Sequence, residues 1–431
     1  MIKLPASKSR IDKAGAFLAK PADDFDQAYL DEYVELESVF DKFRELHLRP
    51  LTELTSALKV ALDSEGEGYY IAQRLKRKPQ IIRKLNRFST RLTQLQDIGG
   101  LRIIVNKNDD VDRVAKIIDG LLETENTFRL LRSPDYRPYG RDDSGYRALH
   151  KIVRLGPVDL EIQIRSQAQH FWAESIERTS VFYGRRLKEG EGNPLVLQYF
   201  KALSDYFSMV ERGVKRPPSA IRDLEGQREQ AEAVIQSDGL SHLTQGSVNT
   251  DVIYAMLAKQ RANPGRFNNW ILVFDWSTAS FVNWEIASFD ADEAVSQYIR
   301  NEKIYPEEKN YEVVLIGSSD VETVQKTHSH YFGLDRPDKI LEDLGESIRK
   351  FSHNIDLDYG ARRILEVLAQ RKTWGMGKGI QSPTLQNHFC KDVPRFDESL
   401  KLLIDLDFVV SKGGAGVTLN VAKTAEIQSL L

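Results

Sequence analysis

The sequence predicts an α/β (α+β) fold in three parts: an N-terminal half in the order α, β, α, β, β, α, then a small α/β module and a winged-helix-like module. Three observations support this prediction. Apolar residues recur at helical spacing before residue 61, a β-rich segment contains a double glycine at 99–100, and alternating segments at 144–155 and 158–166 flank a Gly-Pro turn. A chain of 431 residues is long enough for two or three such units.

The N-terminal half begins with a long amphipathic helix between 24 and about 61, which we expect Pro50 to interrupt. Its apolar face is formed by Tyr29, Tyr33, Leu36, Phe40 and Phe43. A basic run follows, with eight basic residues and no acid between 74 and 91, while Ile81, Ile82 and Leu85 keep a helical apolar stripe. This basic run predicts a helix with one cationic and one buried face.

The predicted strands of this half follow the basic run. DIGGLRIIV at 97–105 predicts a strand, and 109–122 predicts a helix. SGYRALHKIVRL and VDLEIQIRS alternate between apolar and polar positions and predict an antiparallel pair. Two further helices are expected at 167–188 and 194–211.

Composition and turn signals divide the chain into four segments. Residues 1–212 form the first domain, and the polar, proline-bearing stretch from Lys215 opens a linker with a helix at 213–262. WILVFDW, SFVNWEIASF and YEVVLIGS predict three strands of a small α/β module at 263–350. Three helices and a hairpin with a KGGAG turn predict the winged-helix-like module at 351–431.

Charge and cysteine content exclude several classes of protein. The net charge of −3 gives no field over the whole molecule that would gather nucleic acid or anionic lipid, so an anion site must be a local patch. The single cysteine, Cys390, cannot form an intrachain disulfide or a thiolate zinc site. With no apolar run of transmembrane length and no apolar secretion signal at the start, we expect a cytoplasmic protein without membrane contact.

Four features that suit polyphosphate chemistry lie between residues 74 and 165: the basic run, an acid before a strand, a Gly-Tyr pair, and a second acid within a strand. Polyphosphate transfer needs cations around the oxygens, acidic ligands for a divalent metal and a pocket that orients the attacking hydroxyl. Asp97 and Glu161 enter from two predicted strands and can converge on Mg²⁺. Tyr146, which follows a glycine, is a candidate for stacking on a nucleotide base.

Five motifs resemble, in order and spacing, the synthetase domain of the RelA/SpoT family of alarmone synthetases: RLKRKPQIIRKL, DIGGLRIIV, SGYRALH, EIQIRS and QHFWAE. The resemblance covers about residues 25–212. It implies a nucleotidyltransferase-like mixed sheet flanked by helices. It also implies an enzyme that uses Mg²⁺ and transfers pyrophosphate from ATP to the 3′-hydroxyl of GDP or GTP, which makes (p)ppGpp and releases AMP.

The resemblance implies a role for each matching residue. The ATP donor would be held by Arg74, Lys76, Arg83, Lys84 and Arg102, with Arg102 stacking on the adenine. Asp97 would hold Mg²⁺, and Glu161 would bind the metal or accept the proton of the attacking hydroxyl. The acceptor site would be formed by Tyr146, His150, Gln163 and Arg165.

The sequence departs from the family ahead of the Gly-Tyr pair. Alarmone makers usually carry Pro-Lys-Pro-Asn there, whereas this chain reads YGRDDSGY. The toxic branch of small alarmone synthetases is also similar at GYRALH and implies a second acceptor, the 3′ CCA end of tRNA, in toxin-antitoxin or phage-defence systems. A catalytically inactive nucleotide-binding module is the third alternative. No His-Asp dipeptide occurs, so we expect no built-in alarmone hydrolase.

Simpler interpretations compete with some of these assignments. The basic run alone is typical of a solvated helix face, and only its neighbours favour a phosphate site. His328 and His330 are assigned structural roles rather than metal binding. Acidic residues on the third helix of the winged-helix-like module disfavour duplex binding, so we expect the C-terminal modules to bind a protein regulator or antitoxin. Resemblance to the family also implies a homo-oligomer.

Overall fold

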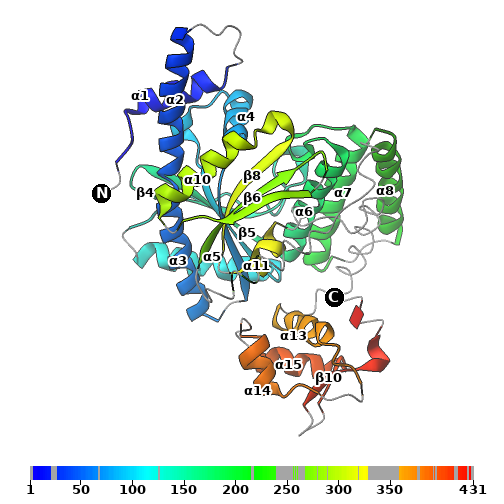
Figure 1. Cartoon of the computed structure of the whole chain (residues 1–431). Helices are drawn as coiled ribbons and strands as arrows, with labels where there is room; N and C mark the ends of the chain where they lie inside the picture. The colour runs from blue at the N-terminus through cyan, green and yellow to red at the C-terminus, as the bar shows by residue number, and fades with distance from the viewer. Residues whose placement is uncertain are drawn as a thin grey trace.

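One mixed sheet of eight strands forms the centre of the protein in the computed structural model (Figure 1). The residues that the structure describes are 3–20, 27–66, 68–124, 127–214, 218–238, 256, 258, 260, 267–278, 280–288, 290–318, 320–328, 359–375, 379–391, 393, 396–411, 416–424 and 427–428. The strand order is β3-β4-β5-β2-β1-β8-β6-β7. Strands β2 and β5 are parallel, and the other neighbours are antiparallel. This arrangement confirms the predicted α/β fold with a mixed sheet.

Five strands of this sheet come from the N-terminal half. They are β1 (Tyr69–Leu75), β2 (Gly99–Val105), β3 (Arg129–Arg132), β4 (Leu149–Leu155) and β5 (Val158–Ser166). The predicted strand at 97–105 and the predicted antiparallel pair are confirmed, with Gly156 at positive φ in the turn between β4 and β5. The sequence did not predict β1 or β3. Strand β1 was missed because its last residues open the basic run, whose helical stripe begins only at Ile81.

The N-terminal helices are α1 (Lys8–Leu18), α2 (Gln27–Glu45), α3 (Leu48–Ser64), α4 (Lys78–Phe88) and α5 (Asn108–Thr124). The predicted long helix is divided at Leu46 and His47, ahead of Pro50 rather than at it. Pro50 lies in the first turn of α3. Backbone N–H groups in a first turn have no partner within the helix, so proline, which lacks this group, is tolerated there. After β5 come α6 (Gln167–Tyr183), α7 (Pro194–Glu211) and α8 (Pro218–Asp238).

The strands of 263–350 extend the N-terminal sheet. The sequence predicts a separate small module there, but β8 (Tyr311–Ser318) pairs with β1, and β6 (Asn268–Asp275) and β7 (Ser280–Ile286) continue outward from it. Helix α10 (Ala291–Ile304) and helix α11 (Val321–Thr327) flank these strands. Strand β1 pairs with β2 on one side only, so the backbone groups of its other edge can bind any further strand. The linker at 213–262 predicts a domain boundary and gives no sign that β8 pairs with this edge.

Two apolar clusters join the two halves of the chain. On one face of the sheet, Leu36 and Phe40 of α2 share a cluster with Ile271 of β6, Tyr298 of α10 and Leu315 of β8. On the other face, Ala72 of β1 shares a cluster with residues of β6, β8 and α11. Arg44 of α2 adds a buried ion pair, since its two terminal nitrogens lie 2.6 and 2.9 Å from the carboxylate of Glu302 in α10. The halves therefore share one core.

The described residues between 359 and 428 form a further apolar cluster, against which Tyr70 of β1 packs. Helix α13 (Tyr359–Gln370), the helical segment that begins with α14 (Ser382–Thr384) and helix α15 (Phe396–Asp405) precede an antiparallel pair of strands, β9 (Val409–Ser411) and β10 (Val417–Leu419). Figure 1 shows these elements, in orange and red, as a group beside the main sheet. Most of the KGGAG turn lies outside the described residues. The element order matches the predicted one, and the winged-helix assignment and its protein partner stay predictions.

No helix in the described part of the chain is long and apolar enough to cross a membrane.

Candidate active site

The candidate site lies on one face of the sheet, where strand alternation gathers polar side chains. In β1, β2 and β5 the residues Ile71, Leu101 and Ile162 belong to the apolar cluster of one face. Their neighbours point to the opposite face. The register places Arg74 opposite Gly100 and Gly100 opposite Glu161, and it likewise aligns the three residues Ala72, Arg102 and Gln163. Two rows of functional candidates therefore cross three adjacent strands.

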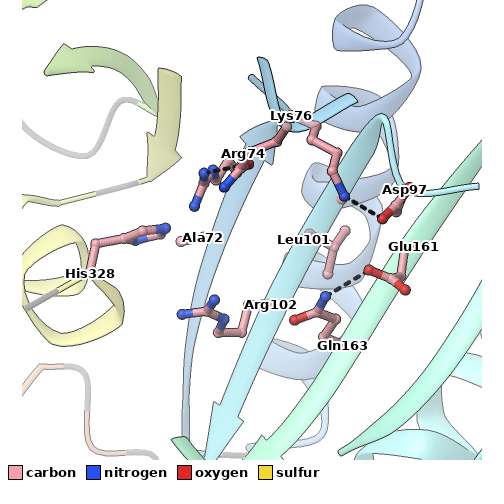
Figure 2. Close-up of a pocket in the computed structure, with 11 residues that line it drawn as sticks. Ala72, Arg74, Lys76, Asp97, Leu101, Arg102, Glu161, Gln163 and His328 are labelled. Carbon is pink, nitrogen blue, oxygen red and sulfur yellow. Dashed lines mark hydrogen bonds and ion pairs between the residues drawn. The ribbon is translucent and has the colours of Figure 1, made fainter. Parts of the chain in front are cut away.

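These two rows form the floor of a cavity of about 160 Å³ (Figure 2). Six of the predicted site residues line it: Arg74, Lys76, Asp97, Arg102, Glu161 and Gln163. Gly100 lies between Arg74 and Glu161 without a side chain, which leaves room above the strand for a ligand. Ala72, Gln80, Leu101 and His328 complete the lining.

Asp97 is held by two lysines of the basic run. The Nζ atoms of Lys76 and Lys84 both lie 2.6 Å from Asp97 Oδ2. Burial opposes ionisation of this carboxyl, but the two ammonium groups lower its pKa well below the ordinary value. Burial in turn lowers the pKa of Lys84. Asp97 is therefore a carboxylate at neutral pH, surrounded by the cations that a phosphate chain would need.

Glu161 belongs to a closed ring of hydrogen bonds. His150 Nδ1 lies 2.9 Å from Glu161 Oε1, and Gln163 Nε2 donates to Glu161 Oε2 at 2.7 Å. Tyr146 Oη lies 2.7 Å from His150 Nε2. Arg165 Nη2 closes the ring by donating to Tyr146 Oη at 2.9 Å and to Gln163 Oε1 at 2.8 Å. The four predicted acceptor-site residues thus surround the carboxylate that faces the cavity.

The ring shifts the pKa of three of its members. For His150, burial favours the neutral ring, yet Tyr146 and Glu161 raise its pKa to about 9. For Tyr146, burial favours the phenol, yet Arg165 and His150 lower its pKa to about 8. Burial also opposes ionisation of Glu161, but His150 lowers its pKa below the ordinary value. Glu161 is therefore charged at neutral pH and is poorly suited to hold a proton.

Replacing His150 by Gln is expected to remove a pH dependence of stability. The pKa of His150 is raised on folding, so its stabilising contribution is complete below the ordinary value of 6.5 and is lost as pH rises towards about 9. Between pH 6.5 and 8 the wild-type free energy of unfolding should fall by about 2 kcal/mol relative to the variant. Urea unfolding at the two pH values measures this difference. Parallel pH profiles for wild type and variant would contradict the assigned charge of His150.

Gly145 determines where Tyr146 lies. Its φ of +82° belongs to the left-handed region, and a Cβ there would lie 3.1 Å from Lys201 Cα and 3.2 Å from Ser204 Cβ. Glycine is thus required both for the backbone conformation and for the close approach of α7. The guanidinium of Arg165 lies 4.9 Å from the Tyr146 ring centroid, a cation–π arrangement. Tyr146 is only partly buried.

The basic run divides between the cavity and structural ion pairs. Arg83 does not line the cavity: its Nη1 lies 2.5 Å from Glu307, and its Nε lies 3.6 Å from Glu189. Lys78 lies 2.5 Å from Glu37 of α2, and Arg77 lies 3.1 Å from Glu312 of β8. The family resemblance implied an ATP-site role for Arg83, and the sequence does not show which acids pair with each cation of the basic run. The acids that bind part of this run come from segments far along the chain.

Sequence reasoning missed His328 as a residue of the cavity. From the sequence, this histidine is assigned a structural role. It follows α11 directly and lines the cavity beside Ala72 and Arg102 (Figure 2). The backbone carbonyl of the preceding residue, Thr327, accepts a hydrogen bond of 2.7 Å from Arg102 Nη1. No local motif marks His328, so only the fold brings it to the site. His330 lies outside the described residues.

The two carboxylates of the cavity fit a magnesium ion that is shared with a substrate. Asp97 Oδ1 is buried and has no hydrogen-bond partner in the structure, and each oxygen of Glu161 keeps a second lone pair. No group of three or more His, Cys, Asp and Glu residues that could hold a metal was found among the described residues. Proteins commonly bind Mg²⁺ through one or two carboxylates, and phosphate oxygens of the substrate and water complete the coordination.

A mixed sheet with helices on its faces, carrying cations and two carboxylates around one cavity, is the architecture of a nucleotidyltransferase-like enzyme. The family described as "Region found in RelA / SpoT proteins" matches residues 73–186, which include β2, β3, β4, β5 and the whole of α6. The GTP pyrophosphokinase YjbM of Bacillus subtilis (strain 168) is 31% identical over 155 residues, covering 31% of this chain and 71% of that protein. The chain belongs to the RelA/SpoT family.

Other relatives match the same region. The GTP pyrophosphokinase YwaC of Bacillus subtilis (strain 168) is 32% identical over 115 residues, covering 23% of this chain and 52% of that protein. Among solved structures, the small alarmone synthetase 1 of Bacillus subtilis bound to its product pppGpp is similar at 25% identity and a TM-score of 0.32, covering 41% of this chain and 92% of that chain.

Proposed function

We propose that this protein is a pyrophosphokinase that transfers the β- and γ-phosphates of ATP to the 3′-hydroxyl of GDP or GTP. The observation that carries the proposal is the meeting of Asp97, Lys76 and Glu161 at one cavity, with Arg74 and Arg102 on its floor. Lys84 does not line the cavity itself but binds Asp97, as Lys76 does. Two of the relatives, YjbM and YwaC, are named GTP pyrophosphokinases, which supports the same reaction and acceptor.

In the proposed reaction the acceptor O3′ forms a bond to the β-phosphorus of ATP, and the bond from that phosphorus to the oxygen bridging it to the α-phosphorus breaks, so that AMP leaves with that oxygen. The proton of the 3′-hydroxyl passes to water. Lys76, Lys84 and Arg74 would donate to the phosphate oxygens, and the lysines would then release Asp97. Asp97 and Glu161 would hold Mg²⁺, which when bound supplies neutralisation of charge on the phosphates. The lowered pKa of Glu161 favours metal binding over proton acceptance. Most acceleration would come from positioning and electrostatics.

The test is to incubate the full-length protein with Mg²⁺ and ATP labelled at the γ-phosphate, offering GDP, GTP or tRNA separately. We expect the label to appear in a guanosine nucleotide, with one AMP released for each labelled product. Labelled guanosine nucleotide without AMP release would overturn the pyrophosphate transfer. Neither label transfer nor AMP release with any acceptor would favour a catalytically inactive nucleotide-binding module.

A second acceptor, the 3′ end of tRNA, is favoured by one feature of the loop before Gly145. Tyr139 on this loop is 94% exposed, and the side chain of Arg141 is 42% exposed. The guanidinium of Arg141 lies 5.4 Å from the ring centroid of Tyr136 on the same loop. A loop that carries an exposed aromatic ring and a cation is the kind of surface on which single-stranded nucleic acid stacks. In the same assay, label that appears only in the tRNA would select this acceptor, which is the one that the toxin-antitoxin or phage-defence alternative requires.

A further inference from the structure

The end of α11 lies at the cavity because α11 follows β8, which pairs with β1. Strand β8 pairs with β1 at Arg74 and Gln73, and only two residues separate Ser318, the end of β8, from the start of α11. Helix α11 therefore returns across the sheet face that carries the site. Val321 and Val324 of α11 pack in the same cluster as Ala72 of β1. His328 follows Val324 by four residues, so it continues the helix face that lies against the sheet.

One further contact holds the end of α11 against β2, and a second orients the ring of His328. Arg102 Nη1 donates to the carbonyl oxygen of Thr327 at 2.7 Å, which places a cation at the C-terminal end of the helix, where it is favoured. Thr327 Oγ1 lies 2.9 Å from Nδ1 of His328 and fixes the ring orientation. Thr327 is fully buried, and His328 is 2% exposed. The imidazole is therefore a built part of the cavity wall.

His328 lies at the end of the cavity that is remote from the two carboxylates. In Figure 2 Ala72 and Arg102 lie next to His328, while Asp97 and Glu161 lie across the strands from it. The phosphate-binding groups Lys76 and Lys84 are at the Asp97 end. The His328 end instead offers two planar groups, an imidazole and a guanidinium, around the small side chain of Ala72. Planar groups of this kind stack on nucleotide bases.

We propose that His328 contacts the base of the donor nucleotide, so that the segment following the family region supplies part of the donor site. This inference rests on the proposed function, because it takes ATP as the donor. It makes the C-terminal segment a structural part of the active site in this chain. The RelA/SpoT region itself ends at residue 186, well before this histidine.

The test compares two ligands by isothermal titration calorimetry: ATP, which has a base, and tripolyphosphate, which has only the phosphate chain. We expect His328→Ala to weaken ATP binding about ten-fold, an effect of the size that loss of one aromatic–base contact produces. Tripolyphosphate affinity should stay within about two-fold of wild type, since Lys76 and Lys84 are unchanged. His328→Phe keeps a planar ring and should retain most of the ATP affinity. His388→Ala, an exposed histidine near the C-terminus, is the control.

Each alternative result has a separate meaning. Unchanged ATP affinity in His328→Ala, with an active wild type, would overturn this inference and leave the proposed function standing. Tighter ATP binding by His328→Ala would also overturn it, because it would show that the imidazole blocks the position that the base takes. Equal losses for both ligands would indicate a collapsed cavity and contradict a base contact. A wild-type protein that binds no ATP would overturn both the proposed function and this inference.

Discussion

Asp97→Asn and Glu161→Gln are each expected to abolish AMP release, with kcat/KM falling on the order of 1,000-fold or more. Each substitution keeps the shape of the side chain and removes its negative charge. In Asp97→Asn the two lysines that lie 2.6 Å from Oδ2 lose their counter-charge, and the metal loses one of its two proposed carboxylate ligands. The measurement is AMP release from ATP in the presence of Mg²⁺ and the active acceptor.

Asp109→Asn is the matched control for this prediction. Asp109 is an exposed acid in the first turn of α5 and does not line the cavity. We expect this control to keep wild-type activity. Circular dichroism should show that all three variants are folded, since neither Asp97 nor Glu161 contributes to an apolar cluster. Wild-type turnover by both active-site variants would remove the site assignment.

Ending the chain after residue 240 is expected to unfold the synthetase half rather than to deregulate it. The truncation removes Ile271, Tyr298 and Leu315 from the cluster that contains Leu36 and Phe40. Each fully buried side chain of this size contributes about 1.5–3 kcal/mol. Loss of three to five such contacts matches the whole net stability of a typical domain, about 5–15 kcal/mol. The edge of β1 would also be exposed to aggregation.

The truncated chain should be insoluble, or should lose its cooperative thermal transition in calorimetry. A second truncation after residue 328 is the control, because it keeps β6, β7, β8, α10 and α11 and removes only the segments that follow. We expect this longer fragment to remain folded. A soluble and active fragment ending at residue 240 would show that the N-terminal half has a sufficient core of its own, and it would support the separate domains predicted from the sequence.

The alternation of side chains along strands made much of the site predictable from the sequence. Arg102, Glu161 and Gln163 occupy polar positions between apolar ones, and this period-two pattern alone directs them to one face of the sheet. The cationic stretch likewise predicted the Asp97 end of the cavity, where Lys76 and Lys84 lie. Arg83 carries the same charge in the same run but binds Glu307, because its counter-ion comes from the second half of the chain.

The sequence by itself determined the family, the residues at the Asp97 end of the cavity and the faces of the strands, since each of these depends on neighbours in the chain or on a local repeat. Only the tertiary structure decided that β8 completes the sheet at β1, that Glu302 pairs with the buried Arg44, and that His328 reaches the cavity. Such contacts join residues more than 200 positions apart. They depend on hydrogen bonding and burial between distant elements, and such pairings leave no periodic signal in the sequence of either element.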